Sequence, residues 1–194
     1  MTEQDAAPEG LPRRVFESLL RTVEEMDTPD GFKAELIRGK IIVSPWLPLR
    51  SARCLRPLRE QLTAHAPPGH VADAAPVLFR FPSLGRAYGP ALFSVDQAAL
   101  EAEGRSADGS ALSLVAEFTS VPARDVDWAE KLDVYGRLVP LYLVVDMQHA
   151  EITCFAAPSP HGYRSRRTVS FGKPLDVPEP FRFVLDTAGF VAGA

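Results

Sequence analysis

A glutamate that ends a run of apolar residues is the first candidate for chemistry. Glu117 follows Ala111-Leu-Ser-Leu-Val-Ala, which is apolar enough to be a strand buried on both faces. An unpaired carboxylate is costly in such a place, so it is kept where it binds a cation, meets a base or lies at the carboxyl end of the strand. That end is where open α/β sheets bind ligands. The alternative is a strand-end glutamate that pairs with a nearby arginine.

A lysine on the next expected helix could approach the same place. Asp127 and Lys131 are four residues apart, which puts them side by side on one face of a helix. Because this helix follows the Glu117 strand, its edge could bring Lys131 back to the end of that strand. A solvent-exposed ion pair is the alternative. Glu35, in an earlier β-rich segment, is a further candidate, although it could equally be an exposed strand residue.

Arginines recur at every third position at the start of another expected helix and along it. The four residues are Arg50, Arg53, Arg56 and Arg59. This spacing gives a basic stripe that could bind the phosphates of DNA, while the leucines between the arginines would face the core. A solvated helix face is the alternative interpretation of the same pattern.

The hydrophobic pattern predicts a scaffold of mixed α/β type for these residues. Helices are expected over residues 12–26, 51–65 and 125–138. Strands are expected on both sides of a hairpin turn at Arg38-Gly39, and over residues 71–81, 87–95, 111–118, 141–146, 151–156, 163–170 and 181–185, with a polar loop over 101–110. The order strand, helix, strand between residues 111 and 146 indicates a parallel pair within a mixed sheet that helices flank.

Length and composition limit the class of protein and the number of domains. The chain has 194 residues, of which 46% are hydrophobic and 24% charged, so we expect a flexible tail over residues 1–12 and a single domain over 13–194. The net charge of −4 gives no overall attraction to nucleic acid. No apolar run is long enough to cross a bilayer and the N-terminus lacks a signal-peptide pattern, so we expect a cytoplasmic protein with no membrane partner.

Four segments, taken in order, resemble the motifs of a known family. Ala34-Glu-Leu-Ile-Arg-Gly-Lys-Ile-Ile-Val-Ser-Pro resembles the opening ELI-x-G signature of the family, and Val115-Ala-Glu-Phe-Thr-Ser resembles its VVEV-x-S strand. Asp127-x-x-x-Lys131-Leu-x-x-Tyr135 resembles its helix motif, and Val139-Pro-Leu-Tyr-Leu-Val-Val-Asp resembles its GVPEYWVVD strand. The chain is therefore similar to the Uma-two family of restriction-endonuclease-like proteins, whose core is of the PD-(D/E)XK nuclease type.

This resemblance implies a metal-dependent site that hydrolyses DNA phosphodiesters. By match to the family, Glu117 is the principal ligand of a Mg²⁺ ion and the Phe118 carbonyl is a further ligand. Glu35 is the outer acid, and Lys131 is the lysine that orients or activates the attacking water. Asp127 supports Lys131 from the same helix.

Two positions depart from the family pattern. Thr119 stands where the strand usually carries a lysine, and Ala91 follows Pro90 where the aspartate of the PD pair is expected. Alanine cannot bind a metal, so the binding of Mg²⁺ should be weakened. Asp96 is five residues farther on, about 16 Å along an extended strand and on its opposite face, which makes it a poor replacement.

The sequence therefore predicts a Mg²⁺-dependent endonuclease-like protein whose activity on DNA is impaired by the loss of one metal-binding aspartate. The alternative is a catalytically inactive protein of the same fold that binds DNA or another protein. A homodimer in which Glu117 and Lys131 form only a buried ion pair is a further alternative.

Overall fold

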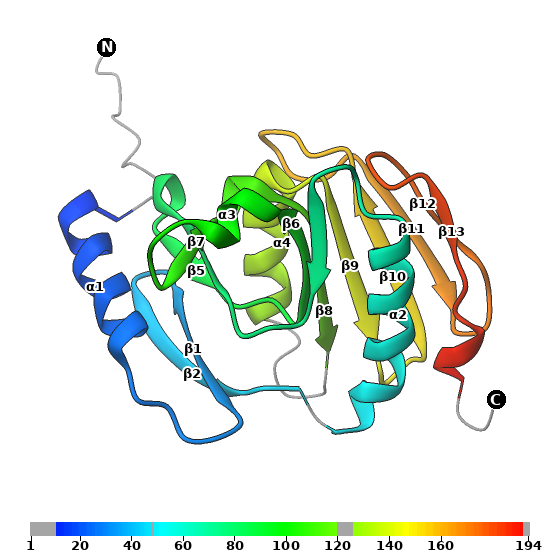
Figure 1. The fold of residues 1–194 in the computed structure, drawn as a ribbon, viewed down its shortest axis with the longest axis horizontal. Coiled ribbons are helices and arrows are strands. Elements are labelled where there is room, and N and C mark those ends of the chain that lie inside the picture. The colour runs from blue at the N-terminus through cyan, green and yellow to red at the C-terminus, as the bar shows by residue number, and fades with distance from the viewer. Residues whose placement is uncertain (1–10, 48, 120–125, 192–194) are drawn as a thin grey trace, which may run out of the picture.

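The computed structural model describes residues 11–47, 49–119 and 126–191, except for the side chains of residues 126–128. These residues form two large β-sheets with helices on their faces (Figure 1). Helix α1 (Arg13–Glu25) covers the outer face of the first sheet. Helix α4 (Val126–Leu138) packs into the core between the sheets, and helix α2 (Ala52–Ala64) covers the far face of the second sheet.

The first sheet has the strand order β2-β1-β5-β4-β7. Its strands are β1 (Phe32–Ile37), β2 (Lys40–Pro45), β4 (Leu78–Phe81), β5 (Arg86–Tyr88) and β7 (Ser106–Asp108). The β1–β2 hairpin turns at Arg38 and Gly39, whose φ angles are 48° and 73°, and two left-handed residues match the twist of the flanking strands. Leu36 packs under α1, so alternation along β1 turns Glu35 toward the interior between the sheets.

The second sheet has the strand order β11-β10-β9-β8-β6-β3. Its strands are β3 (His70–Asp73), β6 (Leu92–Asp96), β8 (Leu112–Thr119), β9 (Leu141–Asp146), β10 (Glu151–Ala156) and β11 (Ser165–Ser170). β8 and β9 are parallel, with Glu117 opposite Val144, and α4 connects them. The predicted strand-helix-strand unit is therefore confirmed.

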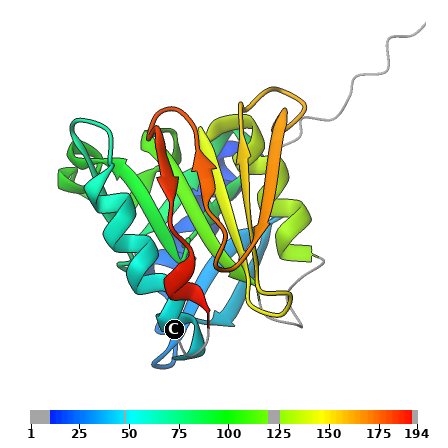
Figure 2. The same cartoon turned by 90° about the vertical axis from the view of Figure 1, so that its right-hand side faces the viewer.

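Apolar cores on both faces of the second sheet, together with the cluster under α1, hold these layers together. The core between the sheets combines aromatic side chains of both sheets with Val134 and Tyr135 of α4. The second core lies under α2, where Leu58 and Leu62 pack against the outer face of the second sheet. A separate hairpin of β12 (Leu175–Val177) and β13 (Phe183–Leu185) closes this core beside α2 (Figure 2).

Most of the predicted elements are confirmed, and two predicted strands are wrong in the same way. The expected strands over 71–81 and 87–95 each divide in two, at Pro76 and Pro90. In both cases the chain leaves one sheet and enters the other: β3 and β6 belong to the second sheet, whereas β4 and β5 belong to the first. Proline lacks the N–H that a continuous sheet ladder requires, which fits this change of sheet.

Smaller differences lie in the polar segments. The predicted loop over 101–110 contains β7, which pairs in parallel with β4, and it follows a short helix α3 (Gln97–Glu101). β12 was not expected from the sequence. The expected tail over 1–12 falls almost entirely outside the described residues, and α1 begins directly after it. No helix in the described part of the chain is long and apolar enough to span a bilayer.

Candidate functional site

A lysine joins two carboxylates from separate elements in the space between the sheets. Lys131 Nζ of α4 lies 2.8 Å from Glu117 Oε1 of β8 and 2.9 Å from Glu35 Oε1 of β1. Glu35 and Lys131 are nearly inaccessible to solvent, whereas 14% of the Glu117 side chain is exposed. The structure thus brings together the three residues that the sequence predicts as catalytic.

The charges in this cluster stabilise one another. Burial alone would raise the pKa of Glu35, but the Lys131 and Lys33 ammonium groups outweigh it and hold the pKa at about 2. Burial would likewise lower the pKa of Lys131, but the carboxylates of Glu117 and Glu35 raise it well above its usual value. Lys131 is therefore a permanent cation at neutral pH and cannot act as a base.

Lys33 and Gly89 complete the surroundings of Glu35, and the sequence analysis missed both. Lys33 Nζ lies 3.4 Å from Glu35 Oε1 and also donates to the carbonyl oxygen of Gly89. The Gly89 N–H donates to the same Glu35 oxygen at 2.9 Å. Lys33 could have been found from the sequence, because it precedes Glu35 by two residues on a strand and therefore shares its face. It is also one of only four lysines in the chain.

Two tyrosines lie beneath the ammonium group of Lys131. Lys131 Nζ lies 5.5 Å from the centre of the Tyr88 ring, which in turn contacts Tyr135 edge to face. Both hydroxyl groups are buried, and neither has a hydrogen-bond partner among the described residues. Burial and the Glu117 and Glu35 carboxylates raise the pKa of Tyr135, so its hydroxyl stays protonated beside the cluster.

A second ion-pair cluster fixes α4 against the first sheet. Glu130, next to Lys131, is buried and accepts hydrogen bonds from Arg38 at the hairpin turn and from Arg86 of β5, the latter at 2.6 Å. Because these two arginines of the first sheet bind Glu130, the adjacent Lys131 is held close to Glu35 of the same sheet. The side chain of Asp127, the predicted supporting residue, lies outside the described residues.

Ala91 is buried immediately before β6, across the ladder from Glu117. Leu92 pairs with Ala116, so extending this antiparallel register by one residue places Ala91 opposite Glu117 on the same face. Directly opposed residues have Cβ atoms about 4.5–5.5 Å apart. By this register, the side chain of residue 91 lies on the same face of the sheet as Glu117.

Asp96, the acid considered as a replacement, and Asp73 of the neighbouring strand β3 both bind other groups. Asp96 is at the far end of β6, where it caps α3 by accepting from the Ala98 N–H at 2.9 Å. Asp73 ends β3, accepts from the Ala74 N–H and lies 3.7 Å from Arg59. Neither carboxylate is part of the cluster around Lys131.

The residues that could hold a metal are Glu117 and the Phe118 backbone. The Phe118 side chain packs toward the core under α2, so only its carbonyl oxygen is available. No group of three or more acidic, histidine or cysteine side chains among the described residues has the arrangement of a metal site. Mg²⁺ is commonly held by one or two carboxylates together with substrate phosphates. One carboxylate and one carbonyl oxygen are few protein donors for such an ion, so substrate phosphate would have to supply further ligands.

The arginine stripe lies on the other side of the second sheet. Arg50 precedes α2 and Arg53, Arg56 and Arg59 lie along it, and all four side chains are exposed. The cluster of Glu35, Glu117 and Lys131 lies on the opposite face of this sheet, which α4 covers. The first turn of α2 nevertheless lies at the same lower edge of the molecule as the carboxyl ends of β8 and β9 (Figure 1).

Comparison with known proteins shows the family and the fold of the chain. No curated protein matches the chain. A crystal structure described as "a putative nuclease belonging to DUF820 from Anabaena variabilis ATCC 29413" has the same fold. The TM-score is 0.66 at 12% sequence identity, over 90% of this chain and 95% of that chain. The model of the family described as "Uma2: Putative restriction endonuclease" matches residues 20–188. Since this match covers most of the chain, from α1 to the end of β13, the chain belongs to the Uma2 family.

Proposed function

We propose that this protein hydrolyses DNA phosphodiesters at the cluster formed by Glu35, Glu117 and Lys131. The observation that carries the proposal is the convergence of β1, β8 and α4 on one buried ammonium group. Lys131 bridges two carboxylates from different strands, and Lys33 brings a second ammonium group to Glu35. Membership of the Uma2 family gives this arrangement its expected chemistry.

The three residues have different roles. Glu117 is the carboxylate with exposed surface, so it meets the water, the metal or the phosphate. Lys131, whose pKa is raised by Glu117 and Glu35 despite its burial, supplies positive charge beside the phosphoryl group as negative charge develops there. Glu35 is the least exposed and accepts from both Lys131 and Gly89, so it positions Lys131 rather than contacting the substrate.

A Mg²⁺ ion would be held by Glu117 and the Phe118 carbonyl. When bound, it would polarise a phosphate oxygen and lower the pKa of an attached water. The carboxylates of Glu35 and Glu117 and the ammonium groups of Lys33 and Lys131 sum to zero charge. A neutral cluster attracts a divalent cation weakly, so we propose that the metal binds together with the anionic substrate, within the cytoplasm.

The test combines metal binding with plasmid nicking. Mg²⁺ and Mn²⁺ are titrated by calorimetry with and without a DNA oligonucleotide, and nicking of supercoiled plasmid is measured in the same buffers. Glu117→Ala is compared with Glu60→Ala, which removes an exposed glutamate from α2. We expect nicking by the wild type and by Glu60→Ala, and a rate lower by on the order of 100-fold or more in Glu117→Ala.

The other outcomes identify the alternatives. Salt-dependent DNA binding without nicking, unaffected by metal, would replace the enzyme with a DNA-binding protein of the same fold. The absence of DNA binding, metal binding and nicking, with a marked loss of stability in Glu117→Ala, would leave a structural ion pair. A homodimer detected by light scattering would then become the functional form to study.

A further inference from the structure

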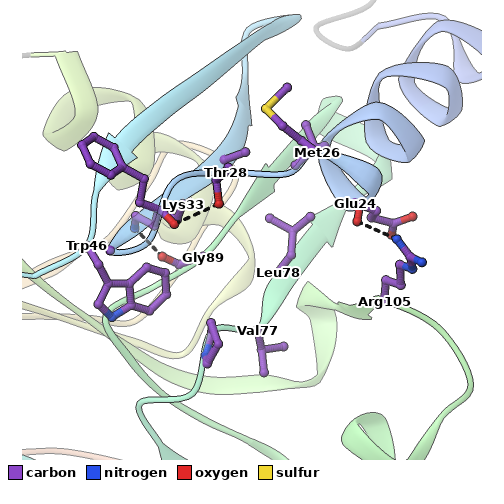
Figure 3. A pocket seen from close by; sticks show the side chains of 14 residues that line it. Glu24, Met26, Thr28, Lys33, Trp46, Val77, Leu78, Gly89 and Arg105 are labelled. Atoms are coloured by element: carbon purple, nitrogen blue, oxygen red, sulfur yellow. Dashed lines mark hydrogen bonds between the residues drawn. The ribbon is translucent and has the colours of Figure 1, made fainter.

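A pocket of about 430 Å³ opens beside the cluster, between the end of α1 and the starts of β1 and β4 (Figure 3). Trp46 lines one side, and Val77 and Leu78 line the other. Lys33 and Arg105 add positive charge to its wall, and Glu24 adds one negative charge beside Arg105. The volume falls within the ~300–1,000 Å³ that small-molecule sites occupy. The pocket is thus large enough for a flat organic group, with apolar and charged walls whose formal charges leave one net positive charge.

The pocket and the cluster share two residues. Lys33 and Gly89 line the pocket, and both also contact Glu35. Glu35 Oε1 lies 3.4 Å from Lys33 Nζ and 2.9 Å from the Gly89 nitrogen. Glu35 is in turn 2.9 Å from Lys131. The pocket wall therefore contacts Glu35, the inner carboxylate of the cluster, through Lys33 and Gly89.

The wall around Trp46 has the chemistry that binds a planar aromatic ring. Lys33 Nζ lies 5.1 Å from the centre of the Trp46 ring, which fixes the indole at the junction with the cluster. Gly89 adjoins the same wall, since a Cβ atom there would make ordinary van der Waals contacts of 3.6–3.9 Å with Val77, Lys33 and Trp46. Nucleobases of any sequence stack on aromatic side chains, and nearby cations attract the phosphates that join them.

We propose that this pocket binds one unstacked nucleobase of a DNA strand, whose backbone passes over Lys33 to the Glu117–Lys131 cluster. The inference rests on the proposed nuclease function and specifies its substrate. A base inside an intact duplex is stacked on both sides and cannot enter such a pocket, so it must be extruded or already single-stranded. The substrate class is therefore single-stranded or locally unpaired DNA.

The test measures binding without cleavage. Single-stranded oligonucleotides carrying a single 2-aminopurine are titrated with protein in EDTA, and both anisotropy and 2-aminopurine fluorescence are recorded. The same strand in a blunt duplex and a strand with an abasic site at the probe position are the nucleic-acid controls. The protein variants are Trp46→Ala, Trp46→Phe, Val77→Phe, which fills the pocket from its other side, and Val184→Ala, an exposed apolar residue of β13.

We expect the wild type and Val184→Ala to prefer the single strand and to change the 2-aminopurine signal. Trp46→Ala and Val77→Phe should bind about tenfold more weakly, and Trp46→Phe should recover most of the affinity because a phenyl ring also stacks. Folded Trp46→Ala and Val77→Phe proteins that bind like the wild type, or equal affinity for the abasic strand, would overturn the proposal. Base binding in EDTA by a protein that does not nick DNA would refute only the nuclease function.

Discussion

Replacing Lys131 by methionine tests whether the cluster is held together as described. The change keeps the length and apolar contacts of the side chain but removes the cation that Glu117 and Glu35 share at 2.8 and 2.9 Å. Removing one partner of a buried ion pair typically costs ~3–5 kcal/mol, because the remaining charge is left uncompensated. For a chain of this size, the melting temperature should fall by roughly 6–20 °C at pH 7.

The pH dependence separates this charge effect from a packing effect. In the wild type the pKa of Glu35 is about 2, below its ordinary value of 4.5. Its contribution to stability, about 3 kcal/mol at 1.36 kcal/mol per pKa unit, is therefore present above pH 4.5 and lost as the pH falls toward 2. Without Lys131, burial, which has the largest influence on Glu35, is opposed by fewer attractions, so the pKa of Glu35 should rise. Protonation of Glu35 then removes its uncompensated buried charge. The loss of stability in Lys131→Met relative to the wild type should therefore become smaller as the pH falls from 7 to 5.

Thermal and denaturant unfolding of the wild type, Lys131→Met and Lys40→Met between pH 5 and 8 provides the measurement. Lys40 is an exposed lysine of β2, so its replacement controls for the loss of a charge. A double variant with Glu35→Gln should regain part of the lost stability. The reasoning is refuted if Lys131→Met unfolds within 1 °C of Lys40→Met at pH 7, or if its deficit does not change with pH.

Three further predictions concern separate parts of the molecule. Ala91→Asp should tighten Mg²⁺ binding on the order of tenfold or more in calorimetry, because it places a carboxylate opposite Glu117. An unchanged affinity for Mg²⁺ would show that position 91 does not reach the metal. Gly109→Ala should lower the denaturation midpoint, since its Cβ would lie 2.2 Å from Phe81. If Arg53 contacts a phosphate, Arg53→Ala should reduce the slope of log K against log salt by about 0.9 in DNA-binding titrations.

Helices and strands were predictable from the sequence where one hydrophobic period continues through the whole segment. The run before Glu117 is apolar on both faces because β8 is covered by α4 on one side and α2 on the other. The connection through α4 to β9 then requires a parallel pair, and this places Lys131 near the strand that precedes it. The closeness of Glu117 and Lys131 was predictable because both residues belong to one strand-helix-strand unit.

The division of the protein into two sheets was not predictable by the same route. A change of sheet leaves little trace in the hydrophobic pattern, since residues on both sides of Pro76 and of Pro90 are β-rich. Glu35 comes from a strand of the other sheet, and nothing local distinguishes it from an exposed strand residue. Its burial depends on contacts with Gly89 and Lys131, which are 54 and 96 residues away along the chain.

The meaning of Ala91 also depends on a residue that the motif comparison did not include. From the motif alone, the alanine removes one of two metal-binding carboxylates and leaves a defective site. In the folded protein, Lys33 adds a second ammonium group beside Glu35, so the cluster is neutral with the alanine and would be negative with an aspartate. Charge neutrality lets the cluster form without a metal, and under the proposed function the substrate phosphate would provide the charge that attracts one. Ala91 and Lys33 would then act on the same quantity, the net charge that a divalent cation meets, so variants of both positions must be compared before the alanine is taken as a loss of activity.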